Sequence, residues 1–227
     1  MTAIRPPEFA PRLEYAALLL VADRLVLADT FPFSRQGGHN RTRIRTGQGR
    51  QWLTVPRRHA GLGQPLAEVE VVDDGWRRRH AHALRAAYGL APFYEHVAPE
   101  WDAVLATPGS LADIAVASVT FAARWLKAPA EIVRASALPG APGSLRGVAE
   151  AAGAETLLTL PESAESDCQS VPAGIGVRVL RFVERERRQT HDGFVAGLGF
   201  LDLAMNHGPR SGEVLRESVV GIEDGRG

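Results

Sequence analysis

The first part of the chain carries two short apolar runs on either side of a helical pattern. Residues 2–6 predict a short extended segment, and the prolines after it force a turn because proline fixes φ and lacks an amide donor. From Pro11, apolar side chains recur at the helical period as far as Val21. Residues 24–28 centre on a continuous apolar run, typical of a strand buried on both faces. The pattern predicts a right-handed βαβ unit with parallel strands.

The next segment predicts a hairpin followed by helices. Glycines separate two β-favouring runs, so residues 42–46 are expected to pair with residues 51–55. A further strand is expected at residues 67–72. Helices are expected over about residues 76–88, 94–106 and 111–127. Asp73 or Asp74 is the expected N-cap of the first helix, and Ser110 is that of the third.

Strands and helices alternate again after Pro129. Strands are expected at residues 131–135, 155–160 and 177–183, the last strand of the fold, with helices at 145–152, around 200–206 and ending near 217, and a loop at 162–176. The pattern predicts the α/β class: a mainly parallel sheet with flanking helices, an opening βαβ unit like that of nucleotide-binding folds, and an inserted hairpin and helical segments. We expect one domain over residues 1–222 and a polar tail over 223–227.

Composition narrows the classes of partner. The 26 acidic and 26 basic residues balance, so the overall attraction expected of a nucleic-acid or membrane-surface binder is missing. Cys168 is the single cysteine, which excludes an intrachain disulfide, and its acidic neighbours argue against a reactive thiolate. No signal peptide is recognisable, and the apolar run at residues 16–22 is too short to cross a bilayer. We therefore expect a soluble, cytoplasmic protein with no nucleic-acid or membrane partner.

The strongest candidate for a binding site is the arginine-rich strand. Alternate residues of a strand project to one face, so Arg41, Arg43 and Arg45 would place three guanidinium groups together. Such groups pair bidentately with phosphate or carboxylate, which suits an anionic small molecule such as a nucleotide sugar or an acyl-adenylate. The alternative is a solvated face of an edge hairpin, and for Arg45 we favour that alternative. We expect the substrate near the tips of the parallel strands, between the hairpin and the helix bearing His80.

Histidines are the candidates for proton transfer. His80 and His82 lie two apart on a helix and do not share a face, so the sequence predicts no metal site. His80, on its helix, and His59, on a glycine-rich loop, are candidate general acids or bases because their pKa lies near neutrality. For each, a purely structural or solvated role is the alternative. Neither G-x-G-x-x-G nor a P-loop occurs, and we expect no cofactor.

Other polar and aromatic residues admit two interpretations. Trp52 faces the arginine strand, where its ring either packs or stacks on a base or sugar. Trp101 and Trp125 fall on apolar helical stripes and are expected in the core. Asp202 and Asn206 lie four apart on one helix face, where they either anchor the helix or contact a ligand. Residues 184–188 are expected to form a solvated charged segment.

Several blocks occur together in one order: residues 40–44 (NRTRI), 51–56 (QWLTVP), Gln64-Pro65, 76–80 (WRRRH), 87–94 and 199–206 (GFLDLAMN) before Gly208-Pro209. The first two are similar to the N-R-x-R-I and W-L-T-V-P blocks of the WbqC-like family of bacteria, whose genes sit among those for surface polysaccharides. With the arginine strand, this resemblance prompts the hypothesis of an acyl- or aminoacyl-transferase acting on an amino sugar or nucleotide sugar. In it Asn40, Arg41, Arg43, Trp52, Gln64 and Asn206 bind substrate, while His80 or His59 transfers the proton.

Two segments depart from the family pattern. The family opens with H-Q-P-x-Y-F-P-W, whereas residues 5–12 read RPPEFAPR and lack the histidine. The family carries a glycine-rich S-G-x-G stretch after a later strand, whereas residues 160–165 read LPESAE. These departures motivate the alternative hypothesis of a non-catalytic binding or scaffold protein that retains the fold.

Overall fold

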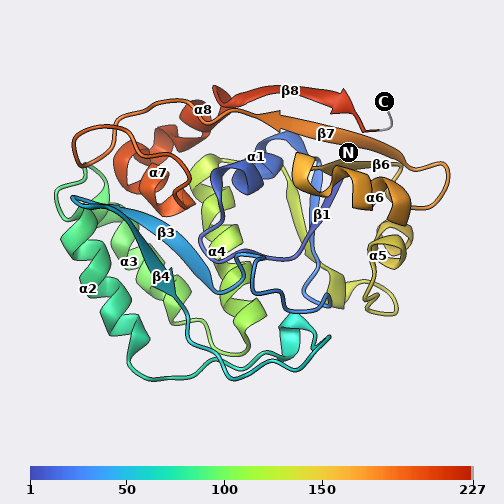
Figure 1. The fold of residues 1–227 in the computed structure, drawn as a ribbon, viewed down its shortest axis with the longest axis horizontal. Helices are drawn as coiled ribbons and strands as arrows, with labels where there is room; N and C mark the ends of the chain where they lie inside the picture. The colour runs from blue at the N-terminus through green and yellow to red at the C-terminus, as the bar shows by residue number, and fades with distance from the viewer. Residues whose placement is uncertain (226–227) are drawn as a thin grey trace.

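A six-stranded sheet forms the centre of the part of the chain that the computed structural model describes, residues 1–225 (Figure 1). Its order is β5-β2-β1-β6-β7-β8, and every neighbouring pair is parallel except β7 and β8. The strands are β1 (Thr2–Arg5), β2 (Arg24–Leu27), β5 (Glu131–Arg134), β6 (Thr156–Thr159), β7 (Gly176–Phe182) and β8 (Val219–Asp224). The predicted α/β class with a mainly parallel sheet is therefore confirmed.

Both faces of this sheet are buried. Successive residues of a strand point to opposite sides, so Ala3 and Leu25 pack into a large core cluster on one face. Ile4 and Val26 pack into a smaller cluster on the other face. Burial on both sides requires strands without regular polar positions, which explains the continuous apolar run in β2.

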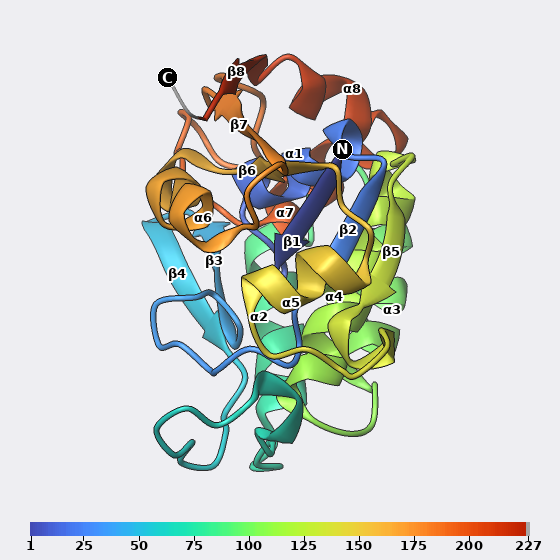
Figure 2. The ribbon, with the colours of Figure 1, turned by 90° about the vertical axis from the view of Figure 1, so that its right-hand side faces the viewer.

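Helices cover the two faces unequally. The larger cluster includes side chains of α1 (Leu13–Val21), α4 (Leu111–Leu126), α7 (Phe200–His207) and α8 (Ser211–Arg216), and extends outward to α2 (Trp76–Tyr88) and α3 (Tyr94–Leu105). The helices α5 (Leu145–Ala151) and α6 (Ala164–Ser170) lie on the opposite face (Figure 2). Within residues 1–225, no helix combines the length and the apolar character needed to cross a membrane.

The predicted hairpin is present as β3 (Arg41–Thr46) and β4 (Gly49–Thr54), which form a separate two-stranded sheet. Ile44 and Leu53 face the large core cluster and are buried. In the antiparallel register Arg43 lies opposite Trp52. The hairpin is thus fixed through its apolar side, which leaves Arg41 and Arg43 on the outer side beside Trp52.

The prediction of a strand at residues 67–72 is wrong. The segment opens instead with a 3₁₀ turn over Leu66–Glu68. The amide of Leu66 donates to the carbonyl of Phe31, and that of Ala67 donates to the carbonyl of Asp29. The loop after β2 therefore takes the hydrogen bonds that a neighbouring strand would need.

Helix capping follows the prediction at one helix and departs from it at another. Ser110 and Asp113 form a reciprocal capping box at α4, as the sequence predicts for Ser110. The aspartate cap expected for α2 is wrong, because Gly75 precedes this helix at φ +82° without a side-chain cap. Asp74 pairs instead with Arg79, at 2.8 Å.

The C-terminal half contains two elements that the sequence pattern concealed. Residues 162–176 include α6 rather than loop alone, and Cys168 on this polar helix packs against the smaller core cluster. β7 is not the last strand, since β8 pairs with it antiparallel. β8 includes Glu223 and Asp224, so the expected tail begins inside a strand. Residues 226–227 of that tail lie outside the described residues.

Candidate functional site

Arg41 and Arg43 converge on one aromatic ring. Both project from the same face of β3, and their guanidinium carbons lie 4.6 and 4.5 Å from the centroid of the Trp52 ring. The Trp52 side chain remains 46% exposed, so it is not a core residue. The hairpin therefore presents two stacked cations at the surface.

These three side chains line a cavity of about 170 Å³, which we call the hairpin compartment. Residues 197–199 form another part of its wall. The Gly199 amide donates to the carbonyl of Arg43 at 2.8 Å, which fixes this segment beside β3. A Cβ atom on Gly197 would lie 3.9 Å from Arg43 Nη1, an ordinary van der Waals contact, so this backbone runs beside the guanidinium group.

The two arginines carry charge that no carboxylate neutralises within residues 1–225. Arg41 Nη2 donates to the backbone oxygen of Arg35 at 3.2 Å, and Arg43 has the Trp52 contact. Other arginines of the chain, such as Arg12 and Arg134, form ion pairs. Two unpaired guanidinium groups held beside one cavity are suited to a phosphate or a carboxylate.

A second cavity of about 350 Å³, the sheet-tip compartment, lies at the carboxyl ends of β1 and β6. The chain leaves β1 toward α1 on one face and leaves β6 toward α6 on the other. Ligands of open α/β sheets bind at such a switch point. Glu8 and Arg12 line both cavities, so we treat the two as compartments of one site.

Charged side chains of opposite sign join the walls of the sheet-tip compartment. Arg12 Nε donates to Glu8 Oε1 at 3.1 Å, and Arg12 Nη2 donates to Glu162 Oε1 at 3.0 Å. Arg5 Nη1 donates to Ser163 Oγ at 2.5 Å, and Arg5 Nη2 lies 3.7 Å from Glu162 Oε1. These contacts connect the segment after β1 with the segment after β6.

Glu8 is the most buried carboxylate of this network. Its residue exposure is 4%, and burial raises its pKa above the ordinary value although the Arg12 charge opposes the effect. A carboxylate whose pKa is raised is a more effective proton acceptor near neutral pH. Glu8 therefore combines access to both compartments with the electrostatics of a general base.

The loop over residues 31–40 closes one side of the site. His39 Nδ1 donates to the carbonyl of Pro7 at 3.0 Å, and the Phe9 amide donates to the carbonyl of Gly38 at 3.0 Å. Burial lowers the pKa of His39, which favours the neutral ring. A Cβ atom on Gly37 would lie 2.2 Å from His39 Nε2, so only glycine fits there without movement of the ring.

The structure places neither candidate proton-transfer histidine in the two compartments. His80 is 4% exposed, donates through Nε2 to the carbonyl of Thr54 at 3.1 Å and packs against Trp76. Burial lowers its pKa to about 4. His59 lies on an exposed loop. His80 thus supports the hairpin from within the core. Glu8, to which the sequence pattern gives no role, lines the hairpin compartment together with Arg41 and Arg43.

Three of the predicted substrate-binding residues make structural contacts. Asn40 Nδ2 donates to the carbonyl of Val55 at 3.0 Å at the start of the hairpin. Gln64 donates to the carbonyl of Glu68 at 2.9 Å within its turn. Asn206 accepts a hydrogen bond from Thr190 at 3.0 Å. None of the three lines the hairpin or the sheet-tip compartment.

Arg45 departs from the solvated position expected for it. It is 5% exposed and donates to the carbonyl of Asp192 at 2.8 Å, so it ties the hairpin to the segment before α7. The charged segment 184–188 is also less solvated than expected, since the Arg187 side chain is 5% exposed and pairs with Asp202 at 3.1 Å. Asp202 accordingly anchors α7. Of the tryptophans expected in the core, Trp101 is fully buried, while Trp125 is partly buried against the large core cluster.

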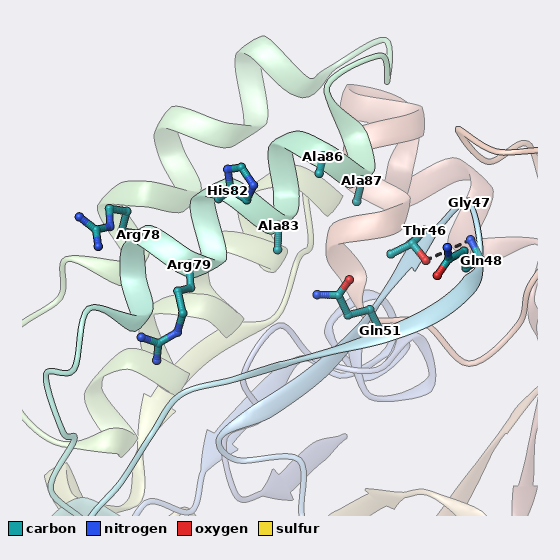
Figure 3. A pocket seen from close by; sticks show the side chains of 10 residues that line it. All are labelled: Thr46, Gly47, Gln48, Gln51, Arg78, Arg79, His82, Ala83, Ala86 and Ala87. Carbon is teal, nitrogen blue, oxygen red and sulfur yellow. Dashed lines mark hydrogen bonds between the residues drawn. The ribbon is translucent and has the colours of Figure 1, made fainter.

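The space between the hairpin and α2 is a separate, open trough of about 800 Å³ (Figure 3). The substrate was expected both at the strand tips and between the hairpin and α2. These are two separate places in the structure, because the strand tips line the sheet-tip compartment and not the trough. In the trough Arg79 and Ala83 face β4, and Arg79 is already paired with Asp74. The trough has no convergent unpaired cations comparable with Arg41 and Arg43. We therefore assign the candidate site to the two compartments.

Sequence reasoning missed Glu8, Arg12 and Glu162, and it gave His39 no role of its own. Glu8 and Arg12 stand in the proline-rich turn, where the prolines dominated the pattern, and His39 follows a Gly-Gly pair whose steric role is visible only in the fold. The two segments that depart from the family pattern, residues 5–12 and 160–165, contact each other through Arg5, Arg12, Glu162 and Ser163. In the described part of the chain, no three His, Cys, Asp or Glu side chains are grouped to hold a metal ion.

The fold and the site define an open α/β protein with a polar, two-compartment cavity at its switch point. Comparison with known families identifies the particular family: residues 6–214 match the WbqC-like protein family, and the chain belongs to it. "Uncharacterized protein Rv1507c" of Mycobacterium tuberculosis (strain ATCC 25618 / H37Rv) is 30% identical over 100 residues, which cover 44% of this chain and 43% of that protein. No solved structure matches the chain significantly.

Proposed function

We propose that this WbqC-like protein is a transferase that moves an acyl or aminoacyl group onto an amino sugar carried by a nucleotide, in bacterial surface-polysaccharide biosynthesis. The observation that carries the proposal is the unneutralised Arg41 and Arg43 pair beside the hairpin compartment. The diphosphate of a nucleotide sugar supplies the charge that this pair needs.

The position of the cavities supports a small-molecule substrate. The hairpin compartment opens on residues that also line the sheet-tip compartment, and the volumes of about 170 and 350 Å³ together fall in the range of small-molecule sites. In the proposal Arg41 and Arg43 bind the diphosphate. Trp52 holds both guanidinium groups in place.

A second candidate function is a non-catalytic binding or scaffold role. It is favoured by one observation: Arg5 and Arg12 are paired with Ser163 and Glu162 across the strand tips, where the chain departs from the family pattern. In that case nucleotide sugars bind without turnover. Restoring the family residue in an Arg5→His variant would then yield no activity.

Calorimetric titration with UDP- and dTDP-linked hexoses tests the proposal. We expect binding to the wild type, and an affinity about tenfold or more lower in Arg43→Ala, because a hydrogen bond to a charged group contributes about 1.5–3 kcal/mol. Arg78→Ala is the matched control: Arg78 lines the trough beside α2 and neither compartment. The proposal is refuted if no compound of the panel binds, or if Arg43→Ala and Arg78→Ala bind equally well.

A further inference from the structure

Glu8 occupies the boundary between the two compartments. Within residues 1–225 it is the carboxylate that lines both of them, whereas Glu162 lines the sheet-tip compartment alone. Glycine at position 38 leaves room for the Glu8 carboxyl group, since a Cβ atom there would lie 3.3 Å from Glu8 Cδ. A ligand bound across both compartments therefore passes the Glu8 carboxyl group.

Polar atoms near Glu8 lack partners inside the described chain. Arg5 Nε is buried without a hydrogen bond, and Arg5 lines the sheet-tip compartment. The hydroxyl of Tyr15 is also buried and unpaired, and burial together with the Glu8 charge raises the pKa of Tyr15. Buried polar groups without partners are unfavourable. Because Arg5 lines the sheet-tip compartment, a polar ligand or water there would complete its Nε.

The walls of the sheet-tip compartment match a sugar ring better than a second diphosphate. Arg5 and Arg12 are already neutralised by Glu8 and Glu162, so this compartment lacks the free positive charge of the hairpin compartment. Phe31 and Pro32 add apolar wall, while Ser34 and Gln36 add neutral polar groups. A ring with hydroxyl groups and one amine fits that mixture of charged, polar and apolar lining.

We propose that the sheet-tip compartment binds the amine-bearing sugar of the nucleotide sugar, and that Glu8 accepts a proton from the sugar nitrogen during transfer. The proposal rests on the proposed function and adds to it the location of the acceptor amine and the identity of the base. The diphosphate on Arg41 and Arg43 and the amine at Glu8 then belong to one extended ligand.

The bound ammonium first gives one proton to solvent water. The nitrogen of the resulting neutral amine then forms a bond to the acyl carbon of the donor, and the bond from that carbon to the leaving group breaks. The leaving group departs with the electron pair of that bond. One proton passes from the nitrogen to the Glu8 carboxylate, which becomes a carboxylic acid, and the product is an amide. The raised pKa of Glu8 supports this direction of proton transfer.

The test compares ligands that differ at one group. UDP- and dTDP-linked hexoses with an amino group at carbon 2, 3 or 4 are titrated against their hydroxyl counterparts by calorimetry. We expect the wild type to bind at least one amino compound about fivefold or more tightly than its hydroxyl counterpart, since the ammonium ion pairs with Glu8. Glu8→Gln should lose that preference, so that the amino compound binds no more tightly than its hydroxyl counterpart.

Two further variants distinguish a specific loss of amine binding from a general loss of folded structure. Glu14 also pairs with Arg12, at 3.4 Å, but lines neither compartment, so Glu14→Gln should keep the amine preference. Ser34 is an exposed residue at the sheet-tip compartment, and Ser34→Trp should fill that space without disturbing the core. Ser34→Trp should bind UDP as the wild type does and lose the extra affinity for the amino sugar.

The outcomes separate the two proposals. If UDP and dTDP compounds bind through Arg43 but amino and hydroxyl sugars bind equally well, the inference fails and the proposed function stands. The same holds if Glu8→Gln is stable and keeps the preference, or if Ser34→Trp keeps it. If no nucleotide compound binds at all, both fail.

Discussion

Arg43 lies opposite Trp52 in the hairpin register, and its guanidinium carbon is 4.5 Å from the centroid of the indole ring. The guanidinium carbon of Arg41 lies 4.6 Å from the same centroid. One exposed ring therefore holds two like charges together beside a cavity, where their mutual repulsion favours an anionic ligand.

Removal of the ring should weaken ligand binding even though both cations remain. Each exposed cation–π contact contributes about 0.5–1 kcal/mol, so Trp52→Ala should lower the affinity for UDP by about fivefold or more. Calorimetric titration measures this. Trp125→Ala is the control, because Trp125 is partly buried on α4 and lines neither compartment. Equal affinities of the two variants would show that the ring does not position the arginines.

Gly38 should be sensitive to substitution because of its contact with Glu8. Its φ is +70°, and an added Cβ atom would lie 3.3 Å from Glu8 Cδ. Gly63 has a similar φ of +75° with nothing within 4 Å, so Gly63→Ala reports the backbone strain alone. Urea unfolding should show a loss of about 1 kcal/mol for Gly63→Ala and a larger loss for Gly38→Ala. Equal losses would mean that the Glu8 side chain moves away from the added Cβ atom at no cost in stability.

His80 should make the folded protein less stable in mild acid. Its pKa falls from 6.5 to about 4, first because of burial, and its Nδ1 has no partner among the described residues. Between these values a falling pH protonates the unfolded chain at this residue but not the folded one, so the free energy of unfolding decreases. Stability supplied by the neutral ring is therefore present above pH 6.5 and is lost toward pH 4.

The variant His80→Gln retains a donor for the Thr54 carbonyl and removes the titration. Between pH 7 and about pH 4.5, the wild type should lose about 1–2 kcal/mol more stability than His80→Gln. Urea unfolding at a series of pH values provides the comparison. Parallel curves for the two proteins would contradict the assigned burial of a neutral His80.

Tyr88 connects the hairpin to α7 within the core. Its hydroxyl accepts a hydrogen bond from the Arg45 amide at 2.8 Å and donates to Asp202 Oδ1 at 3.2 Å. Tyr88→Phe leaves a buried amide without its partner and should cost about 1–3 kcal/mol of stability. The half-buried Tyr94 offers a control in Tyr94→Phe, which should change the thermal midpoint little. UDP affinity should be unchanged in both variants, since neither residue lines a compartment.

The parts of the fold that follow from local pattern were predictable. β2 is a continuous apolar run, α4 begins at a Ser110 capping box, and glycines separate the two strands of the hairpin. Elements that are stabilised by contacts with distant parts of the chain were not predictable. The polar α6 is held by packing of Cys168, and β8 exists through pairing with β7, which local sequence does not reveal.

The site divides in the same way. Arg41, Arg43 and Trp52 share a face because of strand periodicity and register, which the sequence already indicates. Glu8 and Glu162 meet because β1 and β6 are neighbours in the sheet although they are distant in the chain. His80 belongs to a family-like block, yet that block places it in the core, where packing against Trp76 accounts for it.

A crystal structure of the protein with a UDP-linked amino hexose tests the central claim most directly. The account predicts the diphosphate within hydrogen-bonding distance of the Arg41 and Arg43 guanidinium groups, with the sugar directed toward Glu8. A diphosphate bound in the trough between β4 and α2, with Arg41 and Arg43 still solvated, would contradict it.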